Sequence, residues 1–152
     1  MGNIFNEDFR DFISALNDSD VEYILVGGYA VILHGYRRTT GDLDIWVNTT
    51  KENYLKLLNA FLNFGLPTTD LSEQNFLDND AIEVFTFGIE PVSIDIMKKV
   101  KGLNFDEALS SSMLYKDQDL PVRFIGYNQL MNAKKAAGRF KDLDDIEKLS
   151  SE

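Results

Sequence analysis

The sequence predicts a mixed α/β domain (of the α/β or α+β class) in which helices flank a single mixed sheet of four to five strands. Segments with helical spacing of apolar residues alternate along the chain with short strand-like segments. The length of 152 residues suits one domain with a single core, and 44% hydrophobic residues supply it. We therefore expect one domain over residues 1–152, with a C-terminal helical segment at about 127–152.

Helices are predicted where apolar residues recur at helical spacing or where a start or stop signal stands. In the first helix Phe9 and Phe12 share a face, and Asn6 can cap the free N–H groups of the first turn. Gly35 is a natural end for the second helix. The predicted helices cover residues 6–17, 29–34, 51–64, 72–77, 105–109, 128–137 and 143–149.

Strands are predicted from short apolar runs and from alternation of polar and apolar residues. Residues 22–26 form an apolar run that ends at a Gly-Gly pair, whereas residues 42–47 alternate. Gly88 and Pro91 bound a turn-like tetrapeptide between two later strands. The predicted strands cover residues 22–26, 42–47, 82–87, 92–97 and 122–125.

The charge of the chain limits its partners. A formal net charge of −10 argues against broad, charge-driven binding to a nucleic-acid duplex. Basic residues gather at 98–101, where ordinary solvated surface is the preferred interpretation, and at 134–141; such local clusters suit a small anionic ligand. The chain has no cysteine, no signal-like N-terminus, and no apolar run long enough to span a bilayer. We therefore expect a soluble cytoplasmic protein without a membrane partner.

Three acids carry the candidate chemistry. Because a strand sends alternate side chains to opposite faces, Asp42 and Asp44 point the same way, and Leu43 points to the core. Asp95 has a similar setting on a later strand. Together these carboxylates could supply an oxygen-rich site for Mg²⁺, completed by water and substrate phosphates. Taken alone, an Asp-x-Asp at a strand edge commonly just faces water, and the glycine turn in front of it is what favours a metal site.

That turn is Gly27-Gly28, which joins a predicted strand to a predicted helix. Glycines in this place allow a ligand to approach the backbone closely, and the N–H groups of a following helix attract an anion. The turn is neither a Walker loop nor a dinucleotide fingerprint. Alone, it is explained equally well as a tight turn.

The run from Gly27 to Ile45, GGYAVILHGYRRTTGDLDI, resembles the signature of the DNA polymerase beta-like nucleotidyltransferase superfamily. In that signature a Gly-Gly or Gly-Ser turn precedes an Asp-x-Asp strand, and Asp95 matches the third acid on a later strand. Within the superfamily the sequence resembles a small bacterial branch that includes the AbiEii-type toxins of abortive infection. The segment from Lys134 to Asp142, KKAAGRFKD, is similar to a helical segment of that branch.

The resemblance implies the nucleotidyltransferase fold and assigns roles to the turn and the acids. Gly27 and Gly28 would hold the triphosphate of an NTP with backbone amides. Asp42 and Asp44 would bind one or two Mg²⁺ ions. Asp95 would complete the metal site and help to activate the acceptor hydroxyl.

The resemblance also draws attention to three basic residues. Arg38 would pair with phosphate or with the acidic strand. Lys134 and Arg139 are candidates for contacts with phosphate or with the acceptor. For these two residues a structural role, tying two C-terminal helices together through Asp142, is an equal alternative.

The function implied is transfer of a nucleoside monophosphate from an NTP to a hydroxyl of an RNA end, a protein or a small molecule. The alternative is a non-catalytic nucleotide-binding module, regulatory or antitoxin-like, of a two-component bacterial system. An antitoxin or another partner protein is compatible with both. A structural domain whose acids have no function leaves the joint spacing of the motifs unexplained.

Overall fold

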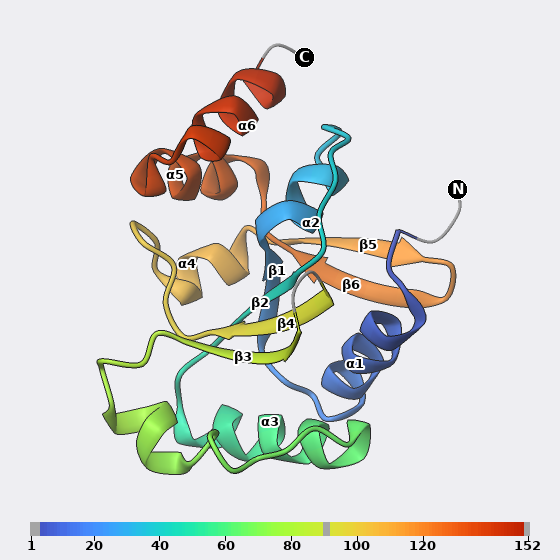
Figure 1. The fold of residues 1–152 in the computed structure, drawn as a ribbon, viewed down its shortest axis with the longest axis vertical. Helices are drawn as coiled ribbons and strands as arrows, with labels where there is room; N and C mark the ends of the chain where they lie inside the picture. Colours follow the sequence, from blue (N-terminus) through green and yellow to red (C-terminus); the bar gives the residue numbers. More distant parts are fainter. Residues whose placement is uncertain (1–3, 90–91, 151–152) are drawn as a thin grey trace.

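A six-stranded mixed sheet in the order β3-β4-β2-β1-β6-β5 organises the part of the chain that the computed structural model describes, residues 4–89 and 92–150 (Figure 1). Strands β1 and β6 and strands β2 and β4 pair in parallel, and the other neighbours are antiparallel. The strands are β1 Tyr23–Val26, β2 Leu43–Val47, β3 Val84–Ile89, β4 Val92–Met97, β5 Met113–Asp117 and β6 Leu120–Phe124.

The mixed α/β class is confirmed, but the prediction of four to five strands was wrong by one. The missed strand, β5, lies at an edge of the sheet and pairs only with β6 among the described residues. Its first two residues, Met113 and Leu114, are both exposed, so no alternation of burial marks it in the sequence. Backbone pairing with β6 defines this strand. The turn predicted at residues 88–91 lies partly outside the described residues.

The helices follow the predicted order. A predicted short helix at residues 72–77 is a single π-helical turn, and the second helix begins at the Gly-Gly pair itself rather than after it. The helices are α1 Glu7–Asp18, α2 Gly27–Leu33, α3 Lys51–Phe64, η1 Gln74–Asp78, α4 Phe105–Ser110, α5 Tyr127–Ala137 and α6 Phe140–Ser150. None of the described helices is both long and apolar enough to cross a membrane.

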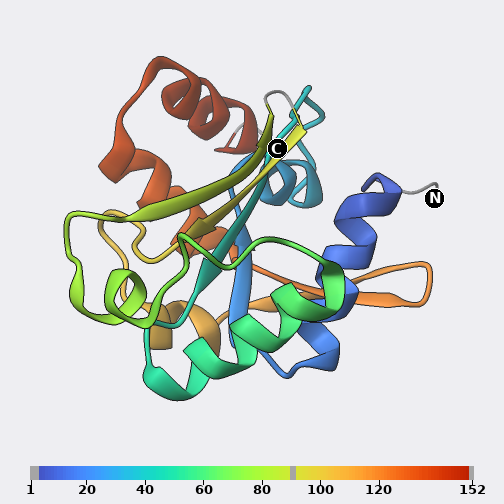
Figure 2. The ribbon, with the colours of Figure 1, turned by 60° about the horizontal axis from the view of Figure 1, so that its bottom comes forward.

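The two faces of the sheet are covered by different helices (Figures 1 and 2). Leu25 and Ile45 belong to a large apolar cluster with α1 and α3. Ile24 and Trp46, one position along each strand, belong to a second cluster with α4, α5 and α6. This alternation follows from the two-residue period of a strand. It leaves the C-terminal end of β1, the start of β2 and the neighbouring Asp95 of β4 beside the C-terminal helices.

A buried amide fixes the opposite ends of these strands. The Asn53 side chain, in the first turn of α3, accepts a hydrogen bond from the Glu22 amide at 2.8 Å. It donates to the carbonyl oxygens of Glu22 at 3.1 Å and Asn48 at 2.8 Å. One side chain thereby satisfies three backbone groups that precede β1 and follow β2.

We predict that Asn53→Ala lowers the free energy of unfolding by about 2–3 kcal/mol, because it removes a buried side chain that bonds three part-buried backbone groups and leaves the Glu22 amide and the Asn48 carbonyl without this partner. Urea unfolding measures the change. Asn63→Ala, at an exposed position of the same helix, is the matched control and should have little effect. Equal stability of the two variants would contradict the prediction.

Candidate functional site

The register of the sheet places two of the three predicted acids opposite each other. Strand β2 pairs in parallel with β4 so that Asp44 lies directly opposite Asp95. Strand β1 pairs with the other side of β2, where Val26 is opposite Asp44. Gly27 is the next residue after Val26, and it therefore lies over the Asp44 carboxylate.

The two carboxyl groups are close enough to share a proton. Burial, a hydrogen bond with Asp95 and the nearby charges of Asp95 and Asp42 raise the pKa of Asp44 to about 7, and the charge of Lys141 opposes this shift. The buried Oδ1 of Asp95 has no hydrogen-bond partner among the described residues. Such an oxygen in a protein interior calls for a donor or a cation.

Asp42 approaches the pair from the segment just before β2. Its Oδ1 accepts a hydrogen bond of 2.9 Å from the Ser93 hydroxyl of β4. Within the described residues no group of three or more acidic, histidine or cysteine side chains is arranged to hold a metal ion by itself. The donor set nevertheless fits Mg²⁺ of the kind that proteins bind with one or two carboxylates and substrate phosphates, because a cation can replace the shared proton and engage the unpaired Asp95 oxygen.

Positions 27 and 28 leave no room for a side chain, so both require glycine. Gly27 has a φ of +70°, and a Cβ there would overlap the carboxylate oxygen Oδ2 of Asp44. A Cβ at Gly28 would overlap the hydroxyl of Thr40. The backbone at this turn therefore lies against the acidic strand and against the segment that leads into it.

The predicted site residues line one cavity, which has a volume of about 690 Å³. Its volume is within the range of small-molecule sites, about 300–1,000 Å³. The walls come from β1, β2 and β4, the start of α2, the segment before β2, and the C-terminal helices. All the residues predicted from the sequence line it: Gly27, Gly28, Arg38, Asp42, Asp44, Asp95, Lys134 and Arg139. The structure thus brings the predicted residues together, and their binding roles stay predictions.

Two buried acids of α6 hold the predicted cations. Asp142 accepts from Lys134 Nζ at 3.2 Å and from Arg139 Nε at 2.6 Å. Asp145 lies 3.1 Å from Lys134 Nζ and accepts from Arg38 Nη1 at 2.6 Å. Burial alone would raise the pKa of Asp142, but the hydrogen bonds and charges of Arg139 and Lys134 outweigh it and hold the pKa below its usual range.

These contacts change the interpretation of the three basic residues. Arg38 pairs with Asp145 on α6 rather than with the acidic strand, and its predicted contact with phosphate stays a prediction. The alternative tie between the C-terminal helices through Asp142 is present for Lys134 on α5, and Arg139 pairs with the same Asp142 from the turn before α6. The Arg139 side chain is still 61% exposed, and it remains available to a ligand. The pairing of Asp145 with Arg38 was not predicted, because the two residues are 107 positions apart in the sequence and such a contact leaves no local signal.

The basic cluster at residues 98–101 divides between two roles. Lys98 turns away from the cavity, and its Nζ donates to the carbonyl oxygens of Asn75 at 2.7 Å and Asn79 at 3.0 Å. Lys99 and Lys101 are exposed, as expected for solvated surface, but they also line the cavity. Neither lysine was predicted as a site residue, because a surface lysine has no distinguishing sequence pattern.

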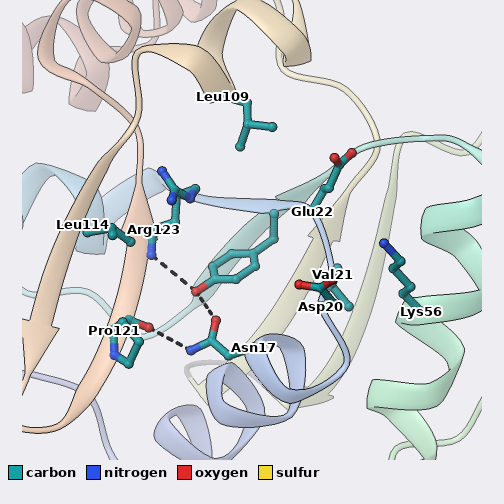
Figure 3. A pocket seen from close by; sticks show the side chains of 10 residues that line it. Asn17, Asp20, Val21, Glu22, Lys56, Leu109, Leu114, Pro121 and Arg123 are labelled. Carbon is teal, nitrogen blue, oxygen red and sulfur yellow. Dashed lines mark hydrogen bonds between the residues drawn. The ribbon is translucent and has the colours of Figure 1, made fainter.

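A second cavity, of about 590 Å³, lies near the start of β1 and contains none of the predicted residues (Figure 3). The Tyr23 hydroxyl is the centre of its polar network. It donates to Asn17 Oδ1 at 2.9 Å and accepts from the Arg123 amide at 3.3 Å. The Asn17 amide in turn donates to the Pro121 carbonyl at 2.8 Å. These bonds join the end of α1 to β1 and β6, which is a structural role.

Neither a model of a known protein family nor a curated protein matches the sequence significantly. A solved structure does match the fold: a Thermotoga maritima protein described as a "putative nucleotidyltransferase". The alignment covers 94% of this chain and 90% of that one, with a TM-score of 0.57 and 13% sequence identity. The chain has a nucleotidyltransferase-like fold. At this identity the similarity extends to the fold alone, and the proposed relation to AbiEii-type proteins is not tested by it.

We predict that Gly27→Ala destabilises the protein more than Gly65→Ala does, by about 1–3 kcal/mol. Both glycines have positive φ, but a Cβ at Gly65 meets no atom within 4 Å, whereas at Gly27 it overlaps Asp44. Urea unfolding of the two variants gives the difference. Equal losses would mean that the Asp44 carboxylate moves aside freely.

The raised pKa of Asp44 makes stability dependent on pH. The folded pKa of about 7 lies above the ordinary 3.8, so the favourable contribution is present below about pH 4 and is lost as pH rises through 7. Asp44→Asn keeps a hydrogen-bond donor towards Asp95 and removes the charge. We therefore expect it to raise the melting temperature at pH 8 by about 2–4 °C per kcal/mol gained, with no gain at pH 4.

Asp70→Asn serves as its control, since it removes one charge from an exposed loop. A gain for Asp44→Asn that is the same at both pH values, or the same as that of Asp70→Asn, would contradict a shared proton at Asp44.

Proposed function

We propose that the protein is a Mg²⁺-dependent nucleotidyltransferase that moves a nucleoside monophosphate from an NTP to an acceptor hydroxyl. The observation that carries the proposal is the register pairing of Asp44 with Asp95 beneath Gly27, inside a cavity of suitable size. Paired carboxylates against a glycine turn suit a triphosphate and its cation. The nucleotidyltransferase-like fold agrees with this assignment.

The reaction requires one bond to form and one to break. The acceptor oxygen bonds to the α-phosphorus of the NTP, the bond from that phosphorus to the oxygen shared with the β-phosphate breaks, and pyrophosphate leaves. We assign to Asp95 the role of accepting a hydrogen bond from the acceptor hydroxyl. The buried Oδ1 of Asp95 has no hydrogen-bond partner among the described residues. The hydroxyl proton ultimately passes to solvent.

Asp42, Asp44 and Asp95 would hold the magnesium. When bound, the metal would neutralise charge on the triphosphate and the leaving pyrophosphate. The amides at Gly27 and Gly28 would face the phosphates, since no side chain intervenes there.

The cations at the cavity form two groups: those already paired with buried acids and those exposed to solvent. Lys134 and Arg38 already bind buried acids, so in this proposal they position the C-terminal helices more than they neutralise phosphate. Lys99, Lys101, Arg139 and Lys141 are the exposed cations at the cavity, and they are better candidates for phosphate contacts. Positioning and charge neutralisation are the main sources of rate enhancement in such transfers.

One observation favours the second candidate function, a non-catalytic nucleotide-binding module that is regulatory or antitoxin-like. The acids as they stand form no three-ligand metal group within the described chain. Such a module would bind an NTP without transferring any part of it. A toxin–antitoxin setting with a partner protein is compatible with either function.

We predict that wild-type protein transfers label from at least one α-³²P-labelled NTP to total cell RNA or lysate in the presence of Mg²⁺. Asp42→Ala/Asp44→Ala should reduce transfer by at least about 100-fold, because it removes two of the charges that hold the metal. Asp11→Ala/Asp70→Ala, at two exposed sites outside the cavity, is the matched control.

The melting temperature with and without Mg-NTP separates the two functions. Stabilisation without label transfer would favour the binding module. If no nucleotide stabilises the protein and none is transferred, the proposed function is wrong.

A further inference from the structure

Phe140 is the most exposed large apolar side chain among the described residues, with 93% of its surface in contact with solvent. It is the first residue of α6, between Arg139 and Lys141. Both neighbours line the carboxylate cavity, but Phe140 itself does not. A ligand enclosed in the cavity would not contact this ring, whereas a longer ligand that extends out of the cavity past Arg139 and Lys141 could reach it.

The backbone that presents Phe140 is held in place. Gly138 ends α5 in the left-handed region, with a φ of +65°. The next residue, Arg139, donates from its amide to Asp142 at 3.2 Å and from Nε at 2.6 Å. Because Asp142 is buried, the turn before Phe140 is anchored to the protein interior. The exposed ring is thus presented on a fixed support.

Cations connect the ring to the carboxylates. The charge of Lys141 acts on Asp44 and opposes the rise in the pKa of that acid. The pKa of Arg139 is raised mainly by its hydrogen bond with Asp142, and Asp44 adds to the rise. Both cations therefore lie within electrostatic range of the acid pair. Neither Lys141 nor Phe140 forms an ion pair or ring contact with another described residue.

We propose that Phe140 is a stacking platform for a base of single-stranded nucleic acid, with Arg139 and Lys141 contacting the adjoining phosphates. The acceptor would then be the end of a single-stranded nucleic acid. This assignment of the acceptor rests on the proposed transferase function, whereas the binding itself does not.

The combination of an exposed ring and flanking cations is what favours this ligand. Proteins bind single strands by stacking bases on aromatic rings and by following the phosphates with basic residues. Stacking on a ring tolerates any base sequence. The short end of a nucleic-acid strand needs few cations for its phosphates, which suits a chain with a net charge of −10. A protein partner would instead also bury Leu143, which is 52% exposed and three residues along the same helix.

Fluorescence anisotropy with a labelled single-stranded RNA of about eight nucleotides tests the proposal at low salt, without NTP. Phe140→Ala should weaken binding by roughly 5- to 150-fold, the range measured for loss of one stacked base. Phe140→Leu, which keeps an apolar side chain but has no π face, should also weaken binding. Phe140→Trp should retain it.

Two control variants separate stacking from a general apolar surface. Leu143→Ala and Leu62→Ala truncate exposed apolar side chains, the second on α3 outside the cavity, and both should bind the RNA as wild type does. The proposal is overturned if the wild type does not bind RNA, if Phe140→Leu binds as tightly as wild type, or if Leu143→Ala weakens binding as much as Phe140→Ala. The last result would instead indicate a protein-docking surface.

Stabilisation by Mg-NTP is measured on the same variants, so that the two proposals can fail separately. Phe140→Ala should keep the nucleotide-induced rise in melting temperature, and Asp42→Ala/Asp44→Ala should lose it. Phe140-dependent RNA binding without any nucleotide effect would contradict the proposed function and support the platform. Stabilisation by Mg-NTP without RNA binding would support the proposed function and contradict the stacking platform.

Discussion

Two carboxyl groups facing each other across parallel strands set the requirements that the rest of the structure meets. Asp44 and Asp95 are partners in the register of β2 and β4, and a slip of either strand by one residue would turn its acid to the opposite face. The register is fixed by the fully buried neighbours Leu43, Ile45 and Ile96, which pack beneath the same strands. The hydrophobic core therefore holds the acids at a separation that their mutual repulsion opposes.

The C-terminal helices supply a second constraint, since they fix the segment that carries Asp42. Asp145 holds Arg38, and Asp144 accepts a hydrogen bond of 3.0 Å from the Tyr36 hydroxyl. Both contacts tie the approach to β2 to α6. The largely buried ion pair of Arg38 with Asp145 contributes geometry more reliably than net stability, because desolvation offsets much of the attraction in such a pair. Their value here is to hold the wall of the cavity in place.

Local signals explain which parts of this structure were predictable. Helix α3 has the predicted bounds because Thr50 caps its start and Gly65 ends it in the left-handed conformation. The acids and the glycine pair were found because their spacing matches a family signature. Strand β5 and the partner of Arg38 were missed for a different reason: both are defined by distant segments, which periodicity and end signals do not report.

The distribution of charge connects the acid pair with the choice of ligand. Six of the 15 Lys and Arg residues line the carboxylate cavity, against five of the 25 Asp and Glu residues. Most of the negative charge therefore lies elsewhere, where it repels polyanions, while the cavity is close to neutral. An extended duplex would contact much of that acidic surface, but a triphosphate or a strand end would meet mainly the cations at the cavity. The acidity of the chain thus restricts where a phosphate ligand can approach rather than excluding it.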